Sequence, residues 1–223
     1  MSLTRRDILD AAVQEFAREG FSGASTVVIA RVAAIKQPLV NYHFGSKAGL
    51  WQAAADYGFV ELTAAFDSIE AVAQDLSPTE MLKLILRTLN RFATRHPRHI
   101  DILRQEMGSN STRTAYLVEQ YLEPVFRLIS EVIQSGVRAG EFKSMPAPFL
   151  SSLLLAAATH FFTMGAVMGP VFSLDVGDKD HCETHGDWIV EVLFDGLTRG
   201  KDIEAASVTS ISRSVRKRRA NAK

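Results

Sequence analysis

The chain has 223 residues, 47% of them hydrophobic, and its 25 Lys and Arg balance its 25 Asp and Glu. This length allows one or two domains with a sizeable core, and the hydrophobic fraction excludes a disordered chain. The single cysteine excludes a disulfide-stabilised scaffold and favours a reducing compartment, so we expect the protein in the cytoplasm.

The zero net charge hides three segments of different sign. Residues 1–50 carry six basic and four acidic residues, residues 51–200 carry twelve and nineteen, and residues 201–223 carry seven and two. We therefore expect the two ends, rather than the acidic centre, to meet a polyanion. The domains expected are a head at 1–50 and a body at 51–200. Residues 201–223 are expected to form a basic, disordered and solvated tail, with sequence-independent attraction to DNA as the alternative.

Apolar residues recur at helical spacing along nearly the whole chain, and alternating strand patterns are absent from the sequence. The spacing predicts a first helix that ends at Gly20, two short helices at 26–33 and 37–44, and a longer helix from Ser46 to about Gln74. Three residues, Ala34-Ile35-Lys36, separate the two short helices and give them the proportions of a helix-turn-helix.

The expected body is helical as well. The capping box Ser77-Pro78-Thr79-Glu80 begins a helix that runs to about Arg95. Further helices are expected at 97–107, at 110–139 with a bend or break at Pro124, at 148–168 and at 184–199. The predicted fold class is therefore all-α, with an N-terminal three-helix helix-turn-helix domain and a larger helical body.

One uncharged run leaves a membrane alternative open. Residues 144–174 contain no Asp, Glu, Lys or Arg, and 149–169 is long enough to span a bilayer. Prolines at 146 and 148, polar residues such as His160, and the lack of basic residues near either end speak against a span. A helix buried in a core or in an oligomer interface is favoured, so we expect no membrane partner.

The second short helix carries residues suited to base contacts. With Val40 and Phe44 facing inward, four residues project outward: Gln37, Leu39, Asn41 and Tyr42. Side-chain amides can pair with adenine, and an outward leucine can contact a thymine methyl group. Pro38 lies in the first turn, where its missing N–H costs nothing. We expect this helix to enter the major groove of DNA.

Phosphate contacts are expected around the same helix. Lys47 lies in the first turn of the next helix, where the macrodipole disfavours a cation unless an anion binds there too. Thr26 can bind a phosphate at the start of the first short helix, and Tyr42 and His43 can donate at the groove edge. The alternative is an ordinary three-helix corner whose polar side chains are solvated.

Residues 4–55 resemble the N-terminal DNA-binding domain of the tetracycline-repressor-like (TetR) family of bacterial regulators. The resemblance is carried by the string ILDAAVQEFAREGF, the pattern T-x-x-I-A-x-x-A and the string NYHFGSKAGLW. It implies a transcriptional regulator, most often a repressor, that binds a palindromic operator in double-stranded DNA. It also implies phosphate contacts from Thr26, Tyr42, His43 and Lys47, and base-facing roles for Gln37, Pro38, Leu39 and Asn41.

Three positions depart from the pattern usual in that family. Ala34 stands in place of a glycine, which suggests a turn that avoids positive φ. Lys36 replaces a serine that often opens the second helix, and its charge is expected to reach the DNA backbone. Asn41 stands where tyrosine is common, which leaves the operator sequence open.

The resemblance implies a homodimer formed through the last two long helices, and the residues agree. Apolar side chains cover every side of the helix expected at 148–168, which is more apolar surface than one small body can bury. Pairing with a second copy would make a four-helix bundle. The interface residues expected are Leu153, Leu154, Ala157, Phe161, Trp188 and Val192.

Regulators of this family generally bind a small effector in the body, which lowers operator affinity through linkage. The expected lining residues are Phe92, His96, His99, Leu103, Glu106, Met107, Tyr121 and Phe126. For each of them a packed core position is the alternative. No cofactor is expected.

A metal site and an enzyme are the remaining alternatives. The segment 178–185 contains residue types that bind zinc, namely His181, Cys182 and His185 with Asp180 or Glu183. A solvated loop in which Thr184 caps the next helix is favoured, so no metal is expected. The sequence holds no P-loop, nucleophile elbow, H-E-x-x-H or dinucleotide motif. We therefore expect no catalytic residues, with a helical enzyme lacking a recognisable motif as the alternative.

Overall fold

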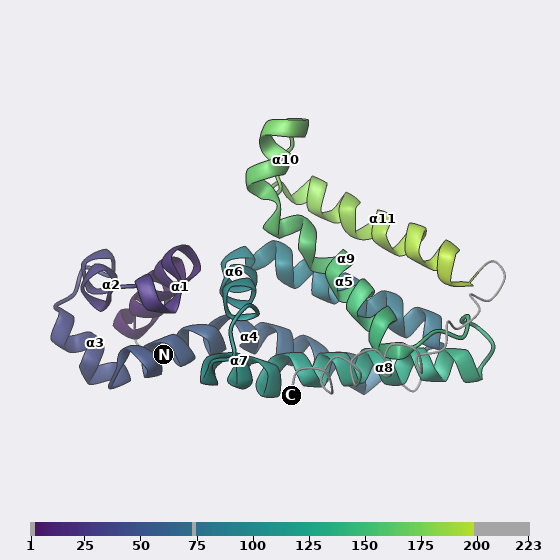
Figure 1. Cartoon of the computed structure of the whole chain (residues 1–223), viewed down its shortest axis with the longest axis horizontal. Helices are drawn as coiled ribbons and strands as arrows, with labels where there is room; N and C mark the ends of the chain where they lie inside the picture. The colour runs from purple at the N-terminus through teal and green to yellow at the C-terminus, as the bar shows by residue number, and fades with distance from the viewer. Residues whose placement is uncertain (1–2, 73–74, 199–223) are drawn as a thin grey trace, which may run out of the picture.

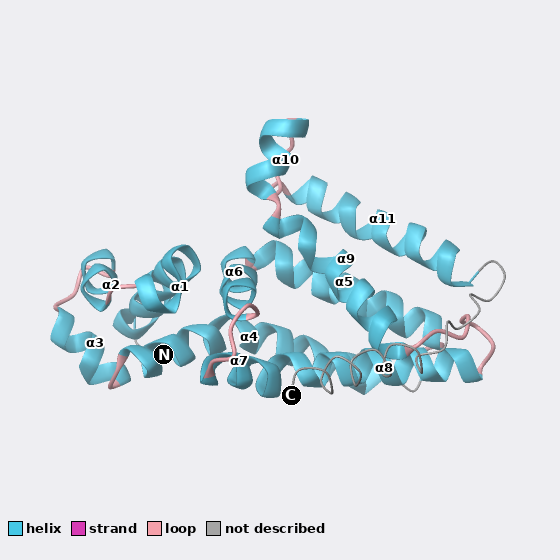
Figure 2. Cartoon of the chain, in the orientation of Figure 1, coloured by secondary structure: helices cyan, strands magenta, loops and turns pink. Residues whose placement is uncertain are grey.

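The computed structural model describes residues 3–72 and 75–198, and every regular element within these ranges is helical (Figure 1, Figure 2). The expected tail at 201–223 lies outside the described residues. The helices are α1 (Leu3–Gly23), α2 (Thr26–Val32), α3 (Gln37–Phe44), α4 (Lys47–Val72), α5 (Pro78–Arg95), α6 (Pro97–Glu106), α7 (Thr112–Leu117), the π-helical turn η2 (Val118–Leu122), α8 (Glu123–Arg138), α9 (Ala147–Thr163), α10 (Gly165–Phe172) and α11 (Lys179–Thr198).

The head consists of α1, α2, α3 and the first turns of α4, at one end of an elongated molecule (Figure 1). Its core is made by apolar residues spaced at helical intervals on each helix: Ile8, Ala12, Phe16, Ile29, Val40 and Leu50. Gly20 (φ 67°) interrupts the helical geometry of α1 at the residue where the sequence predicts the helix to end.

Helix α4 is shared by head and body. The expected domain boundary at residue 50 falls inside it, between Leu50 and Trp51, and both of these side chains are buried. Helix α1 also packs against α6 of the body. The head is therefore joined to the body by one continuous helix and by one packed helix pair.

Helix α5 is the centre of the body and packs against α4, α8, α9 and α11. It begins with the predicted capping box: Ser77 Oγ accepts from the Glu80 backbone N–H, and the Glu80 carboxylate accepts from the Ser77 N–H. Its buried face is the apolar stripe Met81, Leu82, Ile85, Leu86, Leu89, Phe92 and Ala93.

Pro124 divides the long helix expected at 110–139. The chain forms α7, widens into η2 at Val118–Leu122 and continues as α8 from Glu123. Proline has no N–H to donate and its ring crowds the preceding turn. The wider π turn before Pro124 accommodates both effects, so the chain stays helical from α7 to α8 without a loop.

The single uncharged helix expected at 148–168 is wrong in extent, because the structure has two helices that meet at Met164 (φ −97°, ψ 10°). Gly165, Gly169 and Pro170 lower helix propensity there. The Val176 side chain lies 2.7 Å from the position that a Cβ on Gly165 would occupy, so the chain turns where only glycine fits. Among the described residues, no helix combines the length and apolar character needed to cross a bilayer.

The loop expected at 178–185 is also wrong, because α11 already begins at Lys179. Asp178 caps it: its carboxylate accepts from the backbone N–H groups of Asp180 and His181, both at 3.0 Å. Thr184 therefore lies inside a helix. Within the described ranges, no three His, Cys, Asp or Glu side chains are grouped as a metal site would require.

Candidate nucleic-acid interface

Helix α3 lies on the head with one side buried and the other open to solvent. Val40 is 1% exposed and is the residue that anchors the helix, while Phe44 packs against the core at its end. Tyr42 is 82% exposed, and Pro38, Leu39 and Asn41 are exposed as well; Gln37 at the first position is half-buried. Three of the four expected base-facing residues are thus on the surface, and Val40 alone holds the middle of the helix in the core.

The turn between α2 and α3 corrects the expectation for Ala34. Ala34 has φ 55°, in the left-handed region, although it is not glycine. The turn closes through hydrogen bonds from Ala34 N–H to Arg31 O (3.2 Å) and from Ile35 N–H to Ala30 O (3.0 Å). Left-handed backbone costs a non-glycine residue roughly 1–2 kcal/mol. The packing of α2 against α3 therefore sets this backbone conformation, and the residue type does not.

The link from α3 to α4 depends on two glycines. Gly45 has φ 72° and ends α3, with its N–H bonded to Asn41 O at 2.8 Å. A Cβ on Gly49 would lie 2.3 Å from the Phe44 carbonyl oxygen, so only glycine permits this close approach of the two helices. Ser46 Oγ accepts from the Gly49 N–H and caps α4. These contacts fix α3 relative to the start of α4.

Lys47, expected to bind phosphate, is the first residue of α4 and also has partners within the head. Its ammonium group donates to the Ser22 carbonyl oxygen at 3.2 Å and lies 5.0 Å from the centre of the Phe21 ring. The carbonyl end of α1 thus offsets part of the cost of a cation at a helix N-terminus. A lysine has three donors, so further N–H groups remain for an anion.

Thr26 is half-buried and begins α2 directly after Ser25, whose N–H donates to Glu15 at 3.2 Å. Glu15 is buried and its second oxygen pairs with Arg18 at 2.7 Å. This network, which the sequence alone did not indicate, holds the start of α2 in place. Within the described residues, the side chain of Ser25, the N-cap residue of α2, makes no capping hydrogen bond.

His43 and Tyr42 lie side by side at the end of α3, with ring centres 5.3 Å apart. Lys36, the residue before α3, is exposed. Arg5 was missed by the sequence reasoning: its guanidinium lies 5.2 Å from the centre of the Phe44 ring, so a cation from α1 stands beside the last turn of α3. An arginine near the N-terminus gives no local signal for this contact.

The eight residues expected to line an effector pocket do not share one cavity. His96 and His99 line an open cleft of about 960 Å³ between α1 and the helices α4, α5 and α6. Tyr121 lines a cavity of about 160 Å³ between α4 and α8. Of the other five, Met107 is 70% exposed, Phe126 is half-buried, and three are buried: Phe92, Leu103 and Glu106.

Two of these eight residues, Phe92 and Tyr121, have partners that hold the body together. Phe92 and Tyr121 both stack on Phe59, at 5.3 and 4.3 Å between ring centres. Tyr121 and Tyr116 each donate to the same carboxylate oxygen of Asp56 at 2.6 Å. Burial and the hydrogen bond to Asp56 raise the pKa of Tyr121, so its phenol keeps its proton.

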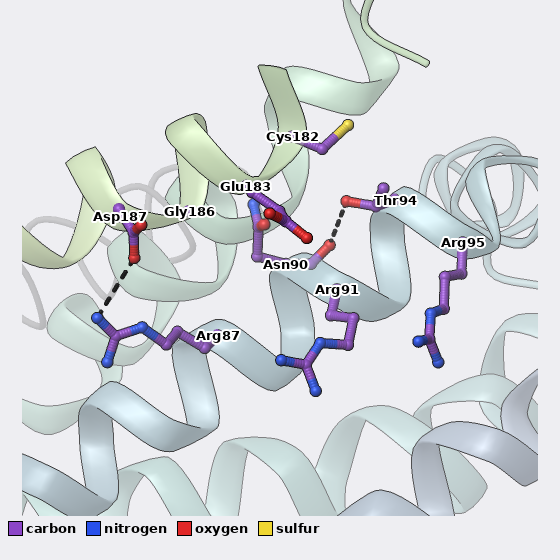
Figure 3. Close-up of a pocket in the computed structure, with 9 residues that line it drawn as sticks. All are labelled: Arg87, Asn90, Arg91, Thr94, Arg95, Cys182, Glu183, Gly186 and Asp187. Carbon is purple, nitrogen blue, oxygen red and sulfur yellow. Dashed lines mark hydrogen bonds and ion pairs between the residues drawn. The ribbon is translucent and has the colours of Figure 1, made fainter. Parts of the chain in front are cut away.

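A further cavity, of about 520 Å³, lies between α5 and α11, and none of the residues expected to line an effector pocket lies in its wall (Figure 3). Arg87, Arg91 and Arg95 project from α5 along it, and Arg87 pairs with Asp187 of α11 at 3.4 Å. Glu183 and Asp187 bring two carboxylates to the same cavity. The lining therefore carries charges of both signs.

The expected dimer residues divide between surface and core. Leu153 on α9 is 55% exposed, and Trp188 and Val192 on α11 are exposed at 58% and 63%. Leu154 is 1% exposed, so it packs inside the protomer and is not available to a partner. Ala157 and Phe161 are half-buried; Phe161 stacks on His185 at 4.2 Å.

Comparison with known proteins gives matches to both parts of the chain. Residues 8–54 match the family "Bacterial regulatory proteins, tetR family", and residues 78–193 match "Tetracyclin repressor-like, C-terminal domain". The chain is 26% identical over 205 residues to the HTH-type transcriptional repressor NicS of Pseudomonas putida, covering 88% of this chain and 93% of NicS. It is 29% identical over 149 residues to the regulatory protein RaaS of Mycobacterium tuberculosis, covering 67% and 64%.

Solved structures share the fold at lower sequence identity. The ketosteroid transcriptional regulator KstR2 of Mycobacterium tuberculosis matches with a TM-score of 0.72 and 17% identity, over 90% of this chain and 97% of KstR2. HlyIIR, a hemolysin II transcriptional regulator, matches with a TM-score of 0.67 and 18% identity, over 88% and 98%. These likenesses concern the fold, whereas the match at 78–193 alone spans more than half of the chain. The chain belongs to the tetracycline-repressor-like (TetR) family of DNA-binding transcriptional regulators, which are not enzymes.

Proposed function

We propose that the protein is a homodimeric repressor that binds a palindromic operator through α3 and releases it when a small effector binds the body. The observation that carries the proposal is the exposed outer face of α3, where Leu39, Asn41 and Tyr42 are open to solvent around the single anchor Val40. An exposed leucine beside an exposed amide is a poor solvent surface but complements a major groove. Such a regulator acts in the cytoplasm, where chromosomal DNA is accessible.

The proposed contacts divide by chemistry. Gln37, Pro38, Leu39 and Asn41 face the bases, with Asn41 placed to pair with adenine. Thr26, Lys36, Tyr42, His43 and Lys47 surround α3 and bind phosphates, which set the position of the helix without reading sequence. Support comes from the head geometry: the starts of α2 and α4 are held by Glu15 and by the α1 carbonyl end.

The proposed dimer forms through α9 and α11. Leu153 on α9, with Phe149 one turn before it, is exposed; so are Trp188 and Val192, one turn apart on α11. Large exposed apolar side chains that gather in stripes on two neighbouring helices, rather than singly, support an interaction surface there. Packing them against a second copy builds a four-helix bundle, which holds two copies of α3 for two operator half-sites.

The proposed effector site is the cavity between α4 and α8. Its walls are mostly apolar, with Leu62, Phe66, Val125 and Leu128, and Tyr121 comes from the π turn η2. Its volume of about 160 Å³ is below the range usual for ligand sites, so binding requires α8 to move away from α4. Helix α4 continues into the head, and a displacement there shifts the population of DNA-binding states.

Selection of bound duplexes from random-sequence DNA tests this function. The wild-type protein is expected to enrich a palindrome with half-sites one helical turn apart, about 34 Å, or a multiple of it. Asn41→Ala should relax the preference at one position in each half-site because it removes one base contact. Enrichment of no sequence by the wild-type protein contradicts the proposal, and an unchanged profile for the variant contradicts the role of Asn41.

A further inference from the structure

Two cations, one from α7 and one from the start of α4, contact the end of α1. Phe21 follows the interruption at Gly20, and its ring stacks on Phe16 with centres 6.2 Å apart. The Arg113 guanidinium carbon, from α7 of the body, lies 3.9 Å from the centre of the Phe21 ring. The Lys47 ammonium, from the first residue of α4, lies 5.0 Å from the same ring. One aromatic ring of the head therefore connects the body with the start of α4.

Arg113 is itself fixed within the body. Its Nε–H donates to Glu106 Oε1 at 2.9 Å, and the Ser111 hydroxyl donates to Glu106 Oε2 at 2.9 Å. Glu106 is buried, and the Arg113 side chain is mostly buried. A buried carboxylate with two donors leaves the guanidinium little freedom. Glu106, expected from the sequence to line an effector pocket, instead orients Arg113.

A second contact joins the end of α1 in the head to the body. The Gln105 side-chain amide donates to the carbonyl oxygens of Phe16 and Ala17, near the end of α1. Gly20 permits this approach, because a Cβ there would lie 2.5 Å from the Gln105 side-chain oxygen. Gln105 at the end of α6 and Arg113 on α7 thus contact one short stretch of α1, at residues 16–21.

We propose that Arg113 is a positioning residue for DNA binding, which holds the head at a fixed angle to the body through Phe21. Arg113 does not touch DNA in this proposal. It restricts the head before binding, so that less conformational freedom is lost when two copies of α3 engage a duplex. The proposal rests on DNA binding by the head and is independent of any effector.

The contact has the strength to matter for affinity. Phe21 is half-buried and the Arg113 side chain is 24% exposed, so the cation lies over the ring in a partly dry site, where such a contact is stabilising. The ion pair with Glu106 keeps the guanidinium over the ring in the absence of DNA. A contact that only stabilised the fold would change the unfolding temperature and leave the affinity of the folded protein unchanged. The two roles therefore predict different measurements.

The test measures affinity for a duplex selected from random DNA by the wild-type protein, at several salt concentrations. Arg113→Ala is expected to weaken binding about tenfold, equivalent to about 1.4 kcal/mol. The dependence of affinity on salt should stay as in the wild type, because no phosphate contact is removed. Arg113→Lys keeps a cation near the ring and should retain more of the affinity. Arg127→Ala, which removes an exposed arginine from α8, is the matched control and should bind as the wild type does.

A double-mutant cycle with Phe21→Leu assigns the effect to the pair. Phe21→Leu keeps an apolar side chain and is expected to fold, so it also tests the proposal if Arg113→Ala does not fold. It should weaken binding alone and add little in the Arg113→Ala background. Wild-type affinity for folded Arg113→Ala or Phe21→Leu, additive effects of the two, or a salt slope reduced by about one overturns the proposal. Failure of the wild-type protein to select any duplex would instead contradict DNA binding itself.

Discussion

At the scale of single residues, Lys47 combines two tasks that the sequence alone could not separate. Its position in the first turn of α4 indicates an anion, and the structure adds a hydrogen bond to Ser22 O and a contact with the Phe21 ring. An ammonium group serves both, since one donor reaches the α1 carbonyl and others stay available. Lys47 therefore links the shape of the head to its proposed phosphate contact.

Lys47→Ala should weaken binding to a selected duplex and lower the slope of log affinity against log salt by about one, because one phosphate contact is lost. Titrations by fluorescence anisotropy at several salt concentrations measure both values. Lys143→Ala is the matched control, since Lys143 also donates to a helix carbonyl oxygen, that of Gly196, but lies in the body. The same reduction in slope for both variants would show that Lys47 has no special role.

At the scale of helices, the packing of α4 on α6 decides the protonation state of a buried histidine, His99. His99 Nε2 donates to Ala54 O at 3.2 Å, and a Cβ on Gly58 would lie 2.1 Å from that nitrogen. Burial, helped by the nearby His96, lowers the pKa of His99 to about 4, although the bond to Ala54 opposes this. The folded state therefore favours the neutral form of His99.

This lowered pKa predicts how stability depends on pH. The unfolded chain binds a proton at His99 below about pH 6.5, while the folded chain does so only near pH 4. The stabilisation by neutral His99 is thus complete above pH 6.5 and is lost as the pH falls toward 4. Between pH 7 and pH 5 the free energy of unfolding should fall by about 2 kcal/mol from this group.

Urea unfolding of wild type and His99→Gln at the two pH values measures this contribution. The glutamine amide can still donate to Ala54 O but does not titrate. The variant should lose about 2 kcal/mol less on acidification than the wild type does. An equal loss in both proteins would show that His99 is not responsible.

At the scale of the whole molecule, the outer faces of α9 and α11 decide the proposed assembly. The apolar residues Leu153, Trp188 and Val192 are exposed on these two helices. Helix α11 lies on the side of the body away from α4 and α8 (Figure 1). A dimer through this face leaves the head of each protomer, at the N-terminal end of α4, outside the interface. Exposure differs sharply between neighbouring residues on α9, since Leu154 is buried and Leu153 is exposed.

Trp188→Arg should convert the dimer to a monomer, because it places an unpaired charge in the apolar interface. Sedimentation velocity measures the mass, and binding to the selected palindrome should weaken because only one copy of α3 is presented. Val60→Arg, at an exposed valine on α4, is the matched control and should leave the mass unchanged. A dimeric Trp188→Arg variant would place the interface elsewhere.

The sequence by itself determined the features that depend on local signals. Helical spacing predicts an all-α chain, the Ser77–Glu80 box begins α5, and the segment Gln37–Phe44 forms α3 with Val40 buried. Family strings at the N-terminus identify the DNA-binding head, and the matches to both domains confirm the family. These features follow from spacing, capping and turn chemistry within a few residues, so they can be read along one stretch of chain.

Only the tertiary structure decided the features that depend on residues far apart in the sequence. Packing between α2 and α3 places Ala34 at positive φ, and Val176 occupies the space beside Gly165 where the helix breaks. The same holds for Arg113, whose partners Phe21 and Glu106 come from α1 and α6. Conformation and contact at such positions are set by which helices meet, and helical periodicity carries no information about that choice.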